Sequence, residues 1–164
     1  MSHEATLIYS VPLIREAVYG FWRRSVGLGM LVAIVLLTGM LTLFLIDGDR
    51  SWRVGAMAVT VFFGVASVIA IYVVHYANAV RKLKDMGSPQ ATIIASESSF
   101  TVTSGAGSAT LPWSSVIEVW QFKNVWLLLF SKAQFFTLPL SYVPAEFRTF
   151  ILQRVAAAGG KIHD

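Results

Sequence analysis

The sequence contains no cysteine among its 164 residues. A chain without cysteine forms no disulfide and offers neither a thiolate nucleophile nor a thiolate metal ligand. Charged residues are also scarce, because they make up 13% of the chain, about half the share typical of soluble domains. Hydrophobic residues account for 55%. A soluble domain of this size buries only about two-thirds of its surface, so this composition favours a protein with a lipid-facing part.

The motifs of the common enzyme classes are missing as well. The sequence has no glycine-flanked nucleophilic serine, no His-Glu-x-x-His motif and no Walker loop. The three histidines, His3, His75 and His163, lie at the two termini and near the end of an apolar run, and Glu118 is one of several dispersed carboxylates. A catalytic triad needs a base held beside its nucleophile. We therefore expect no enzymatic activity, no cofactor and no metal site.

The net charge of +4 is unevenly distributed. Residues 1–86 contain eight Lys or Arg against five Asp or Glu, whereas residues 87–164 contain five against four. The second half therefore lacks the basic surface that binding to a phosphate backbone requires. We expect no nucleic-acid partner.

Two long apolar runs predict a pair of transmembrane helices. Residues 26–46 are a stretch of 21 residues without a charge, and residues 54–80 are a second such stretch of 27 residues. At about 1.5 Å per helical residue, each run is long enough to cross the roughly 30 Å hydrocarbon core of a bilayer. The predicted hairpin occupies residues 26–86, and the lipid bilayer is its first expected partner.

Residues 47–53 predict the turn between the two spans. Asp47, Gly48, Asp49 and Arg50 form a polar turn, and Trp52 suits the aromatic belt of a membrane interface. A calcium loop would need further oxygen ligands at fixed spacings after Asp49, and none follow. Asp47, Asp49 and Arg50 remain candidates for contact with a partner on that side.

Basic residues predict the orientation of the hairpin. Six basic residues flank the outer ends of the two spans: Arg15, Arg23, Arg24, Arg81, Lys82 and Lys84. The turn between the spans contains two, Arg50 and Arg53. Lys and Arg near span ends are retained in the cytoplasm, so both termini are expected there. Within the spans, Gly29 with Ala33 and the series Ala56, Thr60 and Gly64 allow close helix approach, either inside the hairpin or in a homodimer.

Residues 87–164 predict a cytoplasmic β domain. Six segments rich in β-branched and aromatic residues, separated by turn residues, are expected strands: 91–96, 99–104, 108–113, 116–122, 125–131 and 135–140. Pro144 then begins a helix whose apolar stripe contains Phe147 and Ile151, and Gly159 ends it. The expected fold is membrane α+β: a two-helix transmembrane hairpin with an antiparallel sheet capped by a C-terminal helix.

Residues 1–25 add a predicted strand at 5–11 and an amphipathic helix from Pro12 to about Arg24. Both ends of the hairpin emerge on the same side, so this strand is in a position to join the later sheet. The hairpin would then be an insertion into one cytoplasmic fold.

This order of elements resembles the YcxB-like bacterial membrane proteins, above all in LPWSSVIEVWQFKNVWLLLFSKAQFFTLPLSYVPAEFRTFILQRV (111–155). The features that carry the resemblance are Trp113 with Ile117, the hairpin around Asn124, the strand ending in Pro139 and the helix from Pro144. The resemblance implies a pleckstrin-homology-like (PH-like) C-terminal domain and a bacterial inner-membrane location. Family members often have basic residues after the proline that corresponds to Pro139. This chain reads LSYV there, which argues against binding of acidic head groups at that point.

Two functions fit these features. The first is a membrane-anchored binding module whose β domain recognises an unidentified protein or a membrane surface. The second is an immunity protein that guards the cell against a secreted or contact-delivered toxin. The candidate partner surface consists of large aromatic residues of the predicted strands, Trp120, Phe122, Trp126 and Phe135, some of which one helix would leave uncovered. Their alternative role is to fill the core beneath the last helix.

Overall fold

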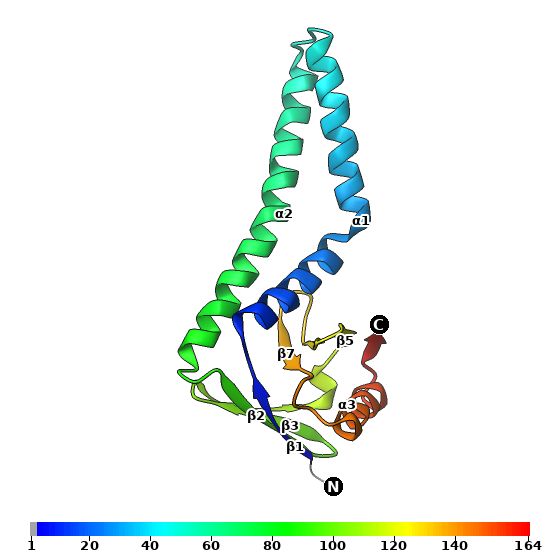
Figure 1. Cartoon of the computed structure of the whole chain (residues 1–164). Helices are drawn as coiled ribbons and strands as arrows, with labels where there is room; N and C mark the ends of the chain where they lie inside the picture. Colours follow the sequence, from blue (N-terminus) through cyan, green and yellow to red (C-terminus); the bar gives the residue numbers. More distant parts are fainter. Residues whose placement is uncertain (1–2) are drawn as a thin grey trace. The chain divides into compact units, whose positions relative to one another are not determined.

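The structure is a computed structural model that describes residues 3–164. Its elements in chain order (Figure 1) are β1 His3–Ile8, α1 Val11–Ile46, α2 Trp52–Asp85, β2 Gln90–Ala95, β3 Ser99–Ser104, β4 Gly107–Pro112, a 3₁₀ turn at Trp113–Ser115, β5 Glu118–Gln121, β6 Val125–Leu129, β7 Phe135–Pro139, α3 Ala145–Ala157 and β8 Lys161–His163. The chain forms two compact units. Residues 19–76 make up the hairpin unit, and residues 1–18 with 77–164 make up the sheet unit.

The hairpin unit consists of most of α1 and α2. Both helices are long and apolar enough to cross a membrane, and the most apolar window of each contains no buried residue. Helix α1 is broken at Gly27, where φ is 68° and ψ is 155°, a conformation that is essentially restricted to glycine. The break lies where the sequence changes from an amphipathic helix to an apolar run. Gly64 of α2 lies against Ile34, whose Cγ1 would be 3.4 Å from an added Cβ, so this small residue serves packing inside the hairpin.

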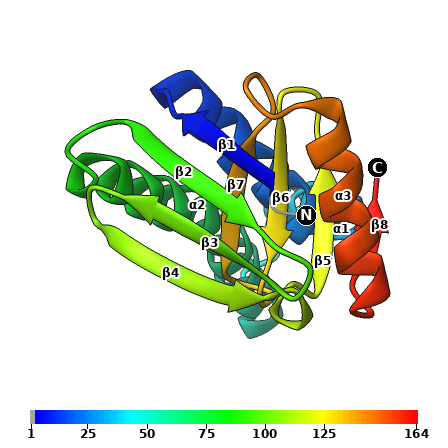
Figure 2. The same ribbon diagram turned by 90° about the horizontal axis from the view of Figure 1, so that it is seen from below.

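The sheet unit is discontinuous in sequence because β1 pairs with β2. The register runs from His3↔Ala95 to Ile8↔Gln90, and the pairing is antiparallel. Strands β3 and β4 continue this first sheet, sheet A, in the order β1-β2-β3-β4, as Figure 2 shows from below. The hairpin is therefore an insertion between two neighbouring strands of one sheet.

The second sheet, sheet B, has the order β7-β6-β5-β8. Sequence analysis predicted one antiparallel sheet, whereas the structure has two, and β8 pairs with β5 in parallel. The strands divide into two sheets at the 3₁₀ turn after β4. In this turn buried Trp113 donates its indole N–H to the Ser96 carbonyl at 2.9 Å. The parallel pair follows from α3, because a helical crossover returns the chain in the same direction.

The core of the sheet unit is built from both sheets and α3, and sheet B contributes buried Val119, Leu127 and Leu138. Leu7, Ile93 and Phe100 of sheet A are buried, as are Phe147 and Ile151 of α3, which confirms the apolar stripe predicted for that helix. The Phe100 and Trp113 rings lie 4.8 Å apart and the His3 ring stacks on Phe147 at 5.3 Å. The aromatic contacts therefore join sheet A, the 3₁₀ turn and α3.

Tyr9 connects the two sheets, and its burial leads to a prediction. Its hydroxyl donates a hydrogen bond to the Thr137 carbonyl at 3.0 Å, and burial raises the pKa of the phenol above its ordinary value of 10.0. Because the folded protein favours the neutral phenol, the stability that Tyr9 contributes is fully present below pH 10 and is lost as the pH rises further.

Tyr9→Phe should lower the free energy of unfolding by about 1 kcal/mol at neutral pH, because the hydrogen bond is lost. It should also reduce the decrease in the free energy of unfolding between neutral and alkaline pH. Urea unfolding of both proteins at pH 8 and pH 11 measures this. An equal decrease in the free energy of unfolding between pH 8 and pH 11 in both proteins would contradict this role of Tyr9.

Candidate functional site

The four aromatic residues proposed as a partner surface do not form one patch. Trp120 and Trp126 are 9% and 7% exposed, and Phe122 and Phe135 are half-buried. Strand register pairs Trp120 with Leu127 and Gln121 with Trp126, so alternation places the two tryptophans on opposite faces of sheet B. All five residues of β6 are buried, which means that both faces are covered there. The two tryptophans thus occupy the positions expected of core residues.

A polar cluster lies along β5 beside β8 and the C-terminal residue. The Trp120 indole N–H donates to Glu118 Oε2 at 2.7 Å, and His163 Nε2 lies 3.6 Å from the same oxygen. Gln121 donates to Asp164 Oδ1 at 2.7 Å. Sequence reasoning treated Glu118 as a dispersed surface carboxylate and His163 as a frayed terminus, because a strand as short as β8 leaves no periodic signal. The cluster joins the C terminus to β5.

The turn between α1 and α2 keeps its three candidate residues at the surface. Asp47, Asp49 and Arg50 are exposed. Asp49 Oδ1 accepts a hydrogen bond from the Ser51 backbone N–H at 2.8 Å, just before α2 begins at Trp52. Asp49 therefore has a structural role in starting α2, while Asp47 and Arg50 leave their charges at the tip of the hairpin unit. Among residues 3–164, no three His, Cys, Asp or Glu residues are grouped so as to hold a metal ion.

Sheet A presents a polar face rich in threonine and serine, which we call the threonine face. Register places Thr6, Thr92, Thr103 and Ser108 in one row across the four strands. The next row contains Glu4, Ile94, Thr101 and Thr110. Thr103 and Ser108 share a hydrogen bond at 2.9 Å, and Thr101 and Thr110 share one at 2.8 Å. These residues are exposed or half-exposed, whereas the opposite face of sheet A contributes to the core.

Strand β4 ends sheet A at a free edge. Its partner on one side is β3, and sheet A continues no further on the other side (Figure 2). Five of its six residues are exposed, and the strand Gly107–Pro112 contains no charge. Proteins usually protect such edges with charged side chains, bulges or covering segments. An exposed and uncharged edge strand is a site where another strand can pair.

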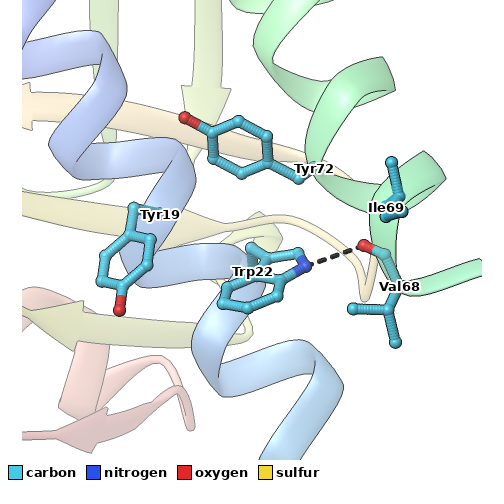
Figure 3. A pocket seen from close by; sticks show the side chains of 5 residues that line it. All are labelled: Tyr19, Trp22, Val68, Ile69 and Tyr72. Carbon is cyan, nitrogen blue, oxygen red and sulfur yellow. Dashed lines mark hydrogen bonds between the residues drawn. The ribbon is translucent and has the colours of Figure 1, made fainter. Parts of the chain in front are cut away.

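The hairpin unit contains an apolar cleft between α1 and α2, which we call the aromatic cleft. It is lined by Tyr19 and Trp22 of α1 and by Val68, Ile69 and Tyr72 of α2, and its volume is about 320 Å³. Trp22 points from α1 toward α2, where its indole N–H donates to the Val68 carbonyl at 2.8 Å (Figure 3). The Trp22 ring lies 5.7 Å from Tyr19 and 6.4 Å edge-on from Tyr72.

Helical spacing explains how these side chains come together. Tyr19 and Trp22 are three residues apart, and Val68 and Ile69 precede Tyr72 by four and three residues, so each set occupies one helix face. The Tyr76 ring continues the row by stacking on Tyr72 at 5.9 Å. The helical spacing of each set is visible in the sequence, but sequence analysis did not predict that Tyr19 and Trp22 face Tyr72 across the hairpin.

Comparison with known proteins identifies part of the sheet unit. Residues 95–151 match the family model described as YcxB-like protein. The match runs from the last residue of β2 through β3 and β4 of sheet A and β5 to β7 of sheet B to the first half of α3. No curated protein and no solved structure matches the chain.

Proposed function

The chain carries a YcxB-like domain at residues 95–151, and we propose that it is a non-enzymatic integral protein of the bacterial inner membrane whose sheet unit binds a protein partner. The family match and the two long apolar helices fit a membrane protein. The finer parts of the proposal concern topology, the class of the β domain and the binding surface.

The spacing of aromatic residues along α2 supports a membrane-spanning hairpin. Trp52 is 79% exposed at the start of α2, and Tyr72 lies 20 residues later. Twenty helical residues cover about 30 Å, the thickness of the hydrocarbon core. Trp and Tyr are enriched at both membrane interfaces. We therefore place Trp52 at one interface and the aromatic cleft at the other.

The distribution of basic residues supports a cytoplasmic sheet unit. Arg23 and Arg24 follow the aromatic cleft on α1, and Arg81, Lys82 and Lys84 lie near the end of α2. At the tip, Arg50 and Arg53 are balanced by Asp47 and Asp49. Retention of basic residues in the cytoplasm then places both termini there.

We assign the sheet unit to the PH-like class. Two four-stranded sheets and one helix with a buried apolar stripe, placed between β7 and β8, support this assignment. The Glu118–His163 pair is held by Trp120 in a structural cluster, and the sequence lacks the nucleophile motifs of the common enzyme classes. Both features favour binding over catalysis.

The observation that carries the binding function is the uncharged free edge at β4. Strand addition satisfies the edge N–H and C=O groups of β4 with those of the partner, and neighbouring side chains supply specificity. Thr110 and Ser108 on the adjoining threonine face would contact the side chains of an added strand. This surface replaces the aromatic residues of sheet B, of which the two tryptophans are buried.

A photo-crosslinking amino acid tests this surface in intact cells. Introduced in place of Thr110, it should give a discrete adduct with one protein. Introduced in place of exposed Thr149 on α3, it should give none. Ser108→Lys adds a charge to the edge strand and should reduce the Thr110 adduct at least several-fold.

The controls separate edge binding from a general effect of charge. Thr6→Lys puts the same charge on the threonine face but on β1, at the opposite edge of sheet A from β4, and should leave the adduct unchanged. Equal adducts from Thr110 and Thr149, or no effect of Ser108→Lys, would contradict strand addition at β4. An adduct with a secreted or contact-delivered toxin would specify the immunity role.

A further inference from the structure

The aromatic cleft combines an apolar lining with a basic rim. Its five lining residues are aromatic or aliphatic, and exposed Arg23 and Arg24 directly follow Trp22 on α1. We propose that the cleft binds an anionic phospholipid of the inner leaflet, with hydrocarbon next to the rings and the phosphate beside Arg23. This inference rests on the membrane insertion proposed above.

The lining of the cleft favours hydrocarbon because the Trp22 indole N–H already has a hydrogen-bond partner within the hairpin unit. The Trp22 N–H is bonded to the Val68 carbonyl inside the unit, so it does not serve a polar ligand in the cleft. The Trp22 ring then contributes an apolar wall. Tyr19 and Ile69 are 51% and 57% exposed, which leaves the cleft open to its surroundings. Its volume of about 320 Å³ lies at the small end of the range of ligand pockets, enough for part of one lipid chain.

The rim favours a negative head group. Arg23 lies four residues after Tyr19 on α1, so the two side chains lie on the same helix face one turn apart. Residues 19–46 and 52–76 contain no Asp or Glu, and the two carboxylates of the unit lie in the turn at its far end. A guanidinium group binds phosphate oxygens through two parallel hydrogen bonds. The carboxylate nearest to Arg23 along α1 is Glu16, seven residues before it, and it accepts hydrogen bonds from the Asn124 amide. Arg23 and Arg24 beside the cleft are therefore complementary to an anionic phospholipid.

The position along α2 favours a lipid of one leaflet. Val68 and Tyr72 follow Trp52 by 16 and 20 residues, which corresponds to about 24–30 Å along the helix. With Trp52 at one interface, the cleft lies at the opposite boundary of the hydrocarbon core, where glycerol and phosphate groups are found. Arg23, which directly follows Trp22 on α1, and the rings of the cleft are thus at the same boundary, where head groups meet the upper parts of the lipid chains.

Fluorescence quenching by brominated lipids tests this site on the full chain. The protein is placed in phosphatidylcholine vesicles that contain increasing fractions of brominated phosphatidylglycerol or brominated phosphatidylcholine. The Trp22 signal is obtained as the difference between the wild type and Trp22→Phe. A basic residue near the membrane surface predicts about a fivefold preference of Trp22 for the anionic lipid. Arg23→Gln should remove most of this preference.

Two further variants and a second readout separate this site from general attraction to the membrane. Ile69→Phe narrows the cleft at an exposed position and should abolish the preference while Arg23 remains. The Trp52 signal, obtained with Trp52→Phe, should show no preference because the charges of the turn cancel. Trp22→Phe also removes the hydrogen bond to Val68, so native mass spectrometry of Arg23→Gln, which keeps that bond, should independently show less retained phosphatidylglycerol.

The outcomes distinguish failure of the site from failure of the membrane assignment. Quenching of Trp22 to the same extent by both lipids would overturn the anionic site, as would a preference that survives Ile69→Phe. In either case Trp52 would still be quenched and the membrane insertion would stand. Absence of quenching at both Trp22 and Trp52 would overturn the membrane insertion and the lipid site together.

Discussion

Replacing Leu7 by alanine is expected to destabilise the sheet unit by about 2–5 kcal/mol, the range for a large aliphatic residue truncated in a core. Leu7 is fully buried, and it pairs with Ala91 across the β1–β2 ladder. The residue precedes the hairpin unit in the sequence, whereas the strand it pairs with follows that unit. A large effect on residues 88–164 from a substitution at position 7 therefore shows that β1 is part of the same fold.

The measurement is resistance of residues 88–164 to limited proteolysis, together with urea unfolding of the full chain. Thr6→Ala is the matched control, because Thr6 neighbours Leu7 in the same strand but points to the exposed threonine face. Its effect should stay below about 1 kcal/mol. If Leu7→Ala and Thr6→Ala leave the protease resistance equally unchanged, the discontinuous sheet unit is wrong.

Local patterning predicted most strands of the sheet unit. The strand predicted at 99–104 lies at Ser99–Ser104. The strand predicted at 91–96 is shifted by one residue relative to β2, and the strand predicted at 135–140 is one residue longer than β7. These segments combine β-branched and aromatic residues with glycine, serine, asparagine or lysine in the turns between them, so short-range preferences were sufficient.

The arrangement of the sheets depended on contacts that a single sequence does not reveal. The division into two sheets requires burial of Trp113 in the 3₁₀ turn, and β8 has three residues whose parallel pairing depends on the crossover through α3. Alternation along β5 and β6 indicates that Trp120 and Trp126 face opposite ways. Alternation does not indicate that both faces of sheet B are covered at these positions. The aromatic residues were therefore predicted to form a partner surface.

The side chains of the aromatic cleft also meet through contacts that the sequence alone does not reveal. Tyr19 with Trp22, and Ile69 with Tyr72, have helical spacing that is visible in the sequence. Their encounter also requires the two helices to be aligned, and α1 changes direction at Gly27 between the cleft and the apolar run. Glycine at position 27 was therefore a signal for the break, but not for the side chains that meet beside it.

The proposed crossing of the membrane by both helices predicts an all-or-none difference in labelling between the turn of the hairpin and the sheet unit. The chain has no cysteine, so each introduced cysteine is the only reactive thiol. Asp47→Cys places it in the exposed turn, and Thr149→Cys places it on the exposed side of α3. Both positions are accessible in the folded chain, and only a membrane would distinguish them.

The most direct test of the membrane-anchored, cytoplasmic sheet unit is labelling of these two variants in spheroplasts with a membrane-impermeant maleimide. Asp47→Cys should be labelled in intact spheroplasts, and Thr149→Cys should be labelled only after the membrane is permeabilised. Labelling of Thr149→Cys in intact spheroplasts, with Asp47→Cys protected until permeabilisation, would contradict the proposed orientation. Recovery of both variants in the soluble fraction would contradict the membrane anchor itself.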